Sequence, residues 1–174
     1  MWKPTRPGVD AIPNIINDLE TGKPVLLFIA IQRDDTEEWA LPGGMVDPGE
    51  CITESLQREF GEEAMNTDKY PERAELIKKM LSNGQLIYQG YVDDPRNTDN
   101  AWMETQGIYT VLRKKSESTL SAVNFHVDQE DLEKLESGSD AKAVKWQRLD
   151  SKLKLYASHE KFVEMTAKHH NAHW

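Results

Sequence analysis

The sequence lacks the features that mark secreted and membrane-spanning proteins. Only one of its 174 residues, Cys51, is a cysteine, so no disulfide can form within the chain. It contains no Asn-x-Ser/Thr glycosylation acceptor, and its longest apolar run, residues 25–31, is far shorter than the ~20 residues that cross a bilayer. We therefore expect an intracellular protein whose chain makes no membrane contact of its own. The sequence does not distinguish the cytoplasm from mitochondria.

Positive charge is also scarce. Lysine and arginine together number 21 against 30 aspartates and glutamates, which gives a formal net charge of −9. A chain this acidic repels nucleic-acid backbones and anionic lipid, so we expect neither as a main partner. A small phosphate-bearing ligand is still compatible with this charge if a divalent cation bridges the like charges.

The length is that of one domain. Residues 1–24 are punctuated by proline and asparagine and are expected to form an irregular N-terminal arm, followed by a single domain over residues 25–174. Hydrophobic periodicity predicts strands at 25–31, 39–41, 85–92, 101–112, 120–127 and 144–149, and helices at 51–65, 72–81 and 159–168. Ser158 is the expected N-cap of the last helix. The irregular mixture favours an α/β fold with layers around one mixed sheet over a doubly wound parallel sheet.

One segment of the chain points to a specific chemistry. Glu59, Glu62 and Glu63 stand at i, i+3 and i+4, so a helix here crowds three carboxylates onto one face. Like charges at this spacing destabilise a helix unless something neutralises them, and oxygen ligands suit Mg²⁺, with Mn²⁺ as an alternative. The glycines of the preceding loop allow backbone to approach the same point. The alternative interpretation is a solvated acidic helix in which Arg58 pairs with Glu62.

The spacing of this segment resembles the signature of the Nudix hydrolase family. Glu50 follows Gly44 after five residues, and after seven more come Arg58-Glu59, an apolar residue, any residue, and Glu62-Glu63. The resemblance implies an α/β/α sandwich around a mixed sheet and hydrolysis of a nucleoside diphosphate linked to another group.

The resemblance also implies a role for each residue of the motif. Glu59 and Glu63 would be the main metal ligands, and Glu62 would complete this catalytic cluster directly or through water. Gly44, Glu50 and Arg58 would be structural, with Glu50 and Arg58 bracing the loop against the helix.

Two further segments, residues 94–102 and 155–159, resemble one branch of this family. The branch comprises the mitochondrial-type ADP-ribose pyrophosphatases and the homologous C-terminal domain of the ADP-ribose-gated melastatin-type TRP channel. The resemblance implies that Asp94, Arg96, Tyr156 and His159 contact ADP-ribose. A carboxylate and a guanidinium suit ribose hydroxyls and phosphate oxygens, and the two rings offer flat faces and polar tips. Without the resemblance, all four would be interpreted as turn, surface or structural residues.

The chain is therefore predicted to hydrolyse ADP-ribose to AMP and ribose 5-phosphate, with water attacking a metal-bridged diphosphate. The general base is not identified, and Glu104 is an outside candidate for it. Two alternatives stay open: an ADP-ribose sensor within a larger channel protein, and a Nudix pyrophosphatase for another substrate such as NADH or a dinucleoside polyphosphate. The intact carboxylates favour turnover over sensing, and the two further segments favour ADP-ribose over the other substrates.

Overall fold

The computed structural model describes residues 5–9, 16–17, 24–110, 112–114, 125–127, 134–139 and 141–173. Its strands are β1 (Thr5–Val9), β2 (Ile16–Asn17), β3 (Pro24–Val25), β4 (Leu27–Arg33), β5 (Trp39–Ala40), β6 (Gln85–Val92), β7 (Met103–Tyr109), β8 (Leu112–Lys114), β9 (Phe125–Val127) and β10 (Ala141–Arg148). Its helices are α1 (Ile52–Phe60), a π-helical turn (Gly61–Met65), α2 (Arg73–Leu81) and α4 (His159–His169). No helix in these ranges is long and apolar enough to span a bilayer.

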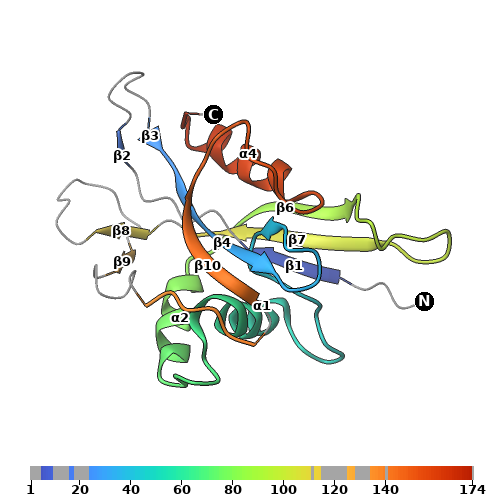
Figure 1. Ribbon diagram of the computed structural model, residues 1–174, viewed down its shortest axis with the longest axis horizontal. Helices are drawn as coiled ribbons and strands as arrows, with labels where there is room; N and C mark the ends of the chain where they lie inside the picture. The colour runs from blue at the N-terminus through green and yellow to red at the C-terminus, as the bar shows by residue number, and fades with distance from the viewer. Residues whose placement is uncertain are drawn as a thin grey trace.

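Two three-stranded sheets form the centre of the molecule (Figure 1). In the order β1-β7-β6, β1 runs parallel to β7 and β6 runs antiparallel to it, whereas the order β10-β4-β5 is antiparallel throughout. β2 pairs with β3, and β8 with β9. The α/β class is confirmed and one of these sheets is mixed, but the strands that the structure describes form separate sheets and not the one sheet that we expected. Periodicity reports that a strand is buried but not which strand it pairs with.

The mixed sheet contains a strand that we expected to be irregular. β1 lies within residues 1–24 and pairs with β7 from Thr5↔Glu104 to Val9↔Ile108. The prediction of an irregular arm is therefore wrong for β1, and also for the short β2. Pro7 lies within β1, which stands at the edge of its sheet, where proline is tolerated. The same proline breaks the apolar pattern that would have predicted the strand.

β4 is buried on both faces, which explains its continuous apolar sequence. Phe28 and Ala30 belong to a hydrophobic core with residues of α4, whereas Ile29 and Ile31 belong to a second core with residues of α1 and α2. Figure 1 shows the corresponding layers, with α1 and α2 on one side of the strands and α4 on the other. This arrangement is the predicted α/β/α sandwich.

The helix that carries the carboxylates begins as predicted but ends early. The backbone N–H of Cys51 donates to Glu54 Oε2 at 2.9 Å, which closes a capping box at the start of α1. α1 ends at Phe60, and the chain continues in the π-helical turn until Asn66, whose φ of 46° is left-handed. Glu62 and Glu63 lie in this wider turn, so the α-helical spacing assumed for all three carboxylates does not hold.

The start of α4 is joined to the loop that follows β6. Ser158 precedes α4 as predicted, but its hydroxyl does not cap the helix. It donates instead to the carbonyl oxygen of Asp93 at 2.9 Å, across 65 positions of sequence. The two segments expected to contact the substrate are thereby brought together.

Candidate active site

Arg58 lies at the centre of the carboxylates of the motif. Its Nε and Nη2 donate to the two oxygens of Glu50, each at 3.0 Å, and its Nη1 donates to Glu59 at 2.9 Å and to Glu62 at 3.3 Å. Nη2 also donates to the carbonyl oxygen of Met45 at 3.1 Å. Hydrogen bonding to Glu50 is the main cause that holds the pKa of Arg58 above its usual value. One guanidinium thus gathers three carboxylates and the preceding loop.

Glu50 attaches this loop to α1. Besides Arg58, it accepts hydrogen bonds from the hydroxyl of Ser55 at 2.5 Å and the backbone N–H of Asp47 at 3.2 Å. These bonds, above all those from Arg58, lower the pKa of Glu50 to about 2. A carboxylate that is engaged on both oxygens and ionised at neutral pH is suited to bracing and poorly suited to proton transfer.

Two glycines bring the loop against the other carboxylates. A Cβ atom on Gly44 would lie 2.0 Å from the carboxylate of Glu59, so any side chain here would displace that group. The backbone N–H of Gly43 donates to Glu63 Oε2 at 2.7 Å. Glu59 and Glu63 are both only 8% exposed, and the bonds from Arg58 and Gly43 offset part of the free-energy cost of burying their charge.

The ligand chemistry of these residues fits a hard divalent cation. Glu59, Glu62 and Glu63 offer only oxygen, the atom that Mg²⁺ and Mn²⁺ prefer. Among the described residues, however, no three His, Cys, Asp or Glu side chains stand grouped as ligands for a metal ion. Glu59 and Glu62 meet at Arg58 Nη1, whereas Glu63 is turned to Gly43. Holding a cation here therefore requires some rearrangement of these side chains.

The four residues predicted to contact the substrate form a second group, which we call the aromatic cluster: Asp94, Arg96, Tyr156 and His159. Arg96 pairs with Asp94 through Nε, at 2.7 Å, and through Nη2. Its guanidinium carbon lies 5.5 Å from the centroid of the buried Tyr156 ring. The ring of His159 meets that of Tyr156 edge-on, with centroids 5.9 Å apart. Residues far apart in sequence are thus assembled around one tyrosine.

His159 is held in its neutral form. Its Nδ1 accepts a hydrogen bond from the backbone N–H of Leu41 at 2.9 Å, which requires that nitrogen to be unprotonated. Burial, followed by the positive charges of Arg33 and Arg96, lowers the pKa of His159 to about 4. Leu41 lies two residues before Gly43, so this bond also links the aromatic cluster to the glycine loop.

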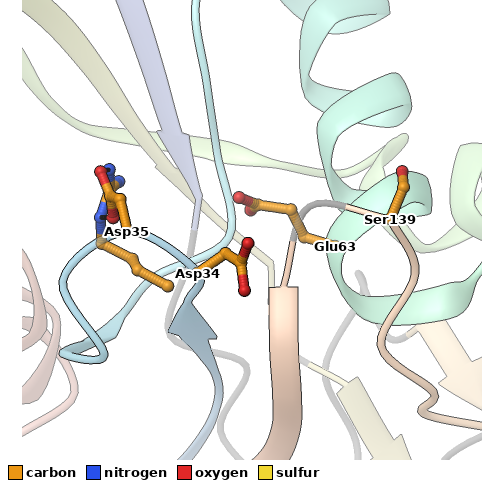
Figure 2. Close-up of a pocket in the computed structure, with 5 residues that line it drawn as sticks. Asp34, Asp35, Glu63 and Ser139 are labelled. Atoms are coloured by element: carbon orange, nitrogen blue, oxygen red, sulfur yellow. Dashed lines mark hydrogen bonds and ion pairs between the residues drawn. The ribbon is translucent and has the colours of Figure 1, made fainter.

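Arg33, which the sequence analysis did not single out, links the two groups. Its guanidinium carbon lies 4.2 Å from the centroid of the Tyr156 ring. It also lines a cavity of about 260 Å³ together with Asp34, Asp35, Glu63 and Ser139. Figure 2 shows the side chains of Asp34 and Glu63 reaching into this space from opposite sides. The one signal in the sequence is that Arg33 ends a buried strand directly before an acidic turn.

A second cavity, of about 350 Å³, adjoins the aromatic cluster. It is lined by Asp93, Asp94 and Pro95 from the polar loop and by Ala157, Ser158 and Lys161 from the start of α4. Glu104 lines neither of these two cavities; it lies on β7 and accepts a hydrogen bond from Trp102 Nε1 at 3.2 Å. The structure therefore offers Glu63, and not Glu104, at the cavity that Arg33 borders.

Two curated proteins match nearly the whole chain. The chain is 46% identical to "Transient receptor potential cation channel subfamily M member-like 2" of Nematostella vectensis, over 98% of this chain and 10% of that protein. It is also 46% identical to "ADP-ribose pyrophosphatase, mitochondrial" of Rattus norvegicus, over 99% of this chain and 46% of that protein. The chain thus spans less than half the length of either relative.

Solved structures share the fold at low sequence identity. The NUDIX domain of Shewanella oneidensis NrtR, complexed with ADP ribose, covers 97% of this chain with a TM-score of 0.55 and 12% identity, over 89% of that chain. A bifunctional NMN adenylyltransferase/ADP ribose pyrophosphatase of Francisella tularensis, complexed with AMP and a Mn ion, covers 97% with a TM-score of 0.58 and 17% identity, over 42% of that chain. At such identities the likeness shows the fold alone.

The model of the NUDIX domain matches residues 5–165. This range begins at the first residue of β1 and contains every residue of the carboxylate motif and of the aromatic cluster. The resemblance drawn from the motif and the fold that it implied are both confirmed, and the chain belongs to the NUDIX domain family.

Proposed function

We propose that this domain hydrolyses ADP-ribose to AMP and ribose 5-phosphate. The observation that carries the proposal is the junction at Arg33, which contacts Tyr156 of the aromatic cluster and shares a cavity with Glu63 of the motif. A group for binding a nucleotide and a group for acting on its diphosphate thus belong to one site. The name of the rat relative and the ligand of the Shewanella domain support the choice of substrate.

Glu59, Glu62 and Glu63 would hold a divalent cation, Mg²⁺ in the first instance and Mn²⁺ as an alternative. Nudix enzymes use divalent metals, and the Francisella protein was solved with a Mn ion. When bound, such an ion neutralises the diphosphate and makes water more acidic. A protein with a net charge of −9 needs that neutralisation to admit an anionic substrate.

The chain's own residues would divide the remaining work. Glu63, which accepts a hydrogen bond from the N–H of Gly43, is the motif carboxylate that borders the cavity, and we infer that it would also accept a proton from water there. In the aromatic cluster, Tyr156 would contact the substrate and Arg96 would offer a positive charge. Neutral His159, whose Nδ1 is occupied as an acceptor, offers Nε2–H as a donor.

The test is a comparison of substrates. The protein is incubated with Mg²⁺ and ADP-ribose, NADH or a dinucleoside polyphosphate, and products are identified by chromatography. We expect kcat/KM to be highest for ADP-ribose and turnover to stop on chelation of the metal. A higher kcat/KM for either competitor would show that the assignment within the family is wrong.

A second candidate function follows from the channel relative, which matches as well as the pyrophosphatase does. In that case the domain binds ADP-ribose as a sensor and is part of a larger channel protein. Binding of ADP-ribose in calorimetry, without AMP release in the assay above, would favour the sensor. We also propose an intracellular location, from the lone cysteine and the name of the rat relative.

A further inference from the structure

Arg33 lies between the two groups of the site, the carboxylates of the motif and the aromatic cluster, which we call the two halves of the site. Its side chain is only 18% exposed, and its guanidinium lies against the ring of Tyr156. Nε and Nη2 donate to the carboxylate of Asp35 at 2.8 and 2.5 Å. Among the residues whose side chains the structure describes, none hydrogen-bonds to Nη1. The guanidinium is therefore fixed by one edge, and its remaining donors are available to a ligand.

Arg33 is a positive charge among carboxylates. Burial is the largest single influence and acts against the cation, but the hydrogen bonds to Asp35 and the Coulombic attraction to Asp35, Tyr156 and Glu63 together outweigh it and raise the pKa of Arg33. Of the described residues that line the 260 Å³ cavity, Arg33 is the one cation, against the carboxylates of Asp34, Asp35 and Glu63. An anion that enters this cavity together with a divalent metal ion can therefore accept hydrogen bonds from one positively charged side chain of the described lining, that of Arg33.

Arg96 gives a direct comparison for this geometry. It pairs with Asp94 through the same two nitrogens, Nε and Nη2, and lies near the same tyrosine ring. The two arginines differ in their neighbours, since Arg33 borders the cavity with Glu63, whereas Asp94, the partner of Arg96, borders the other cavity. Of the two, Arg33 is the one placed beside the carboxylate that acts on the diphosphate.

We propose that Arg33 binds a phosphate oxygen of the substrate through Nη1 and so holds the diphosphate beside Glu63, while Asp35 fixes the guanidinium. The identity of the substrate rests on the proposed function, but the chemistry does not, because any magnesium-bound diphosphate meets the same donor. Arg33 is in this sense a substrate-binding residue, which places the scissile group without taking part in proton transfer.

The test measures binding of three probes by calorimetry in excess Mg²⁺: ADP-ribose, inorganic pyrophosphate and adenosine. Arg33→Gln is compared with wild type and with Lys142→Gln, which removes an exposed cation that pairs with Glu37 in the adjoining turn. We expect Arg33→Gln to weaken binding of ADP-ribose and pyrophosphate about tenfold or more, since a charge-assisted bond to phosphate is lost. The affinity of Arg33→Gln for adenosine should change by less than about twofold. The affinities of Lys142→Gln for all three probes should also change by less than about twofold.

Two additional variants separate anion binding from packing. Asp35→Asn keeps the cation and should keep most of the affinity for pyrophosphate, and Arg33→Lys should recover part of it. Thermal unfolding of each variant shows whether the domain is folded.

The outcomes distinguish the two proposals. Unchanged pyrophosphate and ADP-ribose affinities in folded Arg33→Gln overturn the role of Arg33 and leave the proposed function intact. If Arg33→Gln loses pyrophosphate binding but the wild-type protein does not prefer ADP-ribose, the role of Arg33 is supported and the proposed substrate is overturned. A wild-type protein that binds neither diphosphate overturns both.

Discussion

The two halves of the site balance charge in opposite ways. In the motif, the single guanidinium of Arg58 serves the carboxylates of Glu50, Glu59 and Glu62. Beside the Tyr156 ring, each of two arginines pairs with an aspartate two residues away along the chain. The first half is short of positive charge, and the second is balanced.

We infer that this difference separates residues that serve chemistry from residues that serve substrate binding. A cluster with excess negative charge has free energy to gain from a divalent cation, and a cation at the diphosphate acts where charge changes during reaction. A balanced cluster of rings and paired charges makes contacts that change little between ground and transition state. Variants of the first half should therefore act mainly on kcat and those of the second mainly on KM.

The largest effect on kcat is expected from the carboxylates of the motif, which would act where charge changes during the reaction. Glu62→Gln combined with Glu63→Gln should lower kcat by about a hundredfold or more, with the fold intact, because the site would lose two of its three proposed metal ligands. Steady-state kinetics and thermal unfolding measure the two quantities. Glu72→Gln with Glu75→Gln, a double change of exposed residues at α2, is the matched control and should leave kcat unchanged. Undiminished activity of the first variant under chelation would contradict the metal-site hypothesis.

The next effect tests the binding half. Arg96→Ala, Tyr156→Ala and His159→Ala should each raise KM for ADP-ribose by about tenfold to a hundredfold, because each removes roughly 1–3 kcal/mol of hydrogen bonding or ring contact. Their kcat should stay within about tenfold. Lys168→Ala, at an exposed position near the end of α4, is the control for loss of a side chain. Abolished kcat with unchanged KM in His159→Ala would make His159 an acid or base instead.

The two halves also differed in how far the sequence predicted them. The motif is local: Arg58 and its carboxylate partners lie within one loop and helix, so their spacing alone indicated a shared site. The aromatic cluster joins distant segments and was predicted only through resemblance. Arg33 was missed because its partner, Tyr156, lies far along the chain, and contacts across a fold leave no spacing to detect.

For secondary structure too, local patterns were predicted and features that depend on distant contacts were missed. β6 was predicted with its observed bounds from its alternating pattern. β1 was not predicted, because Pro7 conceals a strand that its pairing with β7 stabilises. The π-helical turn after α1 was also missed, since residue spacing is interpreted on an ideal helix.

A smaller effect concerns stability in the first half. Arg58→Gln should lower the melting temperature by about 2–10 °C, since several charge-assisted hydrogen bonds are lost. Glu50, with its pKa lowered from 4.5 to about 2, gives stability that is present above pH 4.5 and is lost as pH falls toward 2. Calorimetry from pH 5 down to 2 should show this loss in wild type and a weaker one in Arg58→Gln. Lys78→Gln, an exposed control on α2, should behave as wild type.

The smallest effect concerns His159 and falls in a different pH range. Its pKa is lowered from 6.5 to about 4 in the folded protein, so the unfolded chain binds a proton here first as pH falls. Stability from this group is therefore complete above pH 6.5 and declines toward pH 4, by at most about 1.4 kcal/mol per pH unit.

His159→Asn isolates this effect, because an amide oxygen can replace Nδ1 as the acceptor for the N–H of Leu41. Denaturant unfolding of both proteins at several values between pH 7 and 4.5 should give a steeper decline for wild type than for His159→Asn. Equal slopes would show that His159 is not held neutral by the fold. A neutral His159 also predicts that KM for ADP-ribose gains no pH dependence from this ring between pH 7 and about pH 5, since the ring of the folded protein takes up a proton only near pH 4.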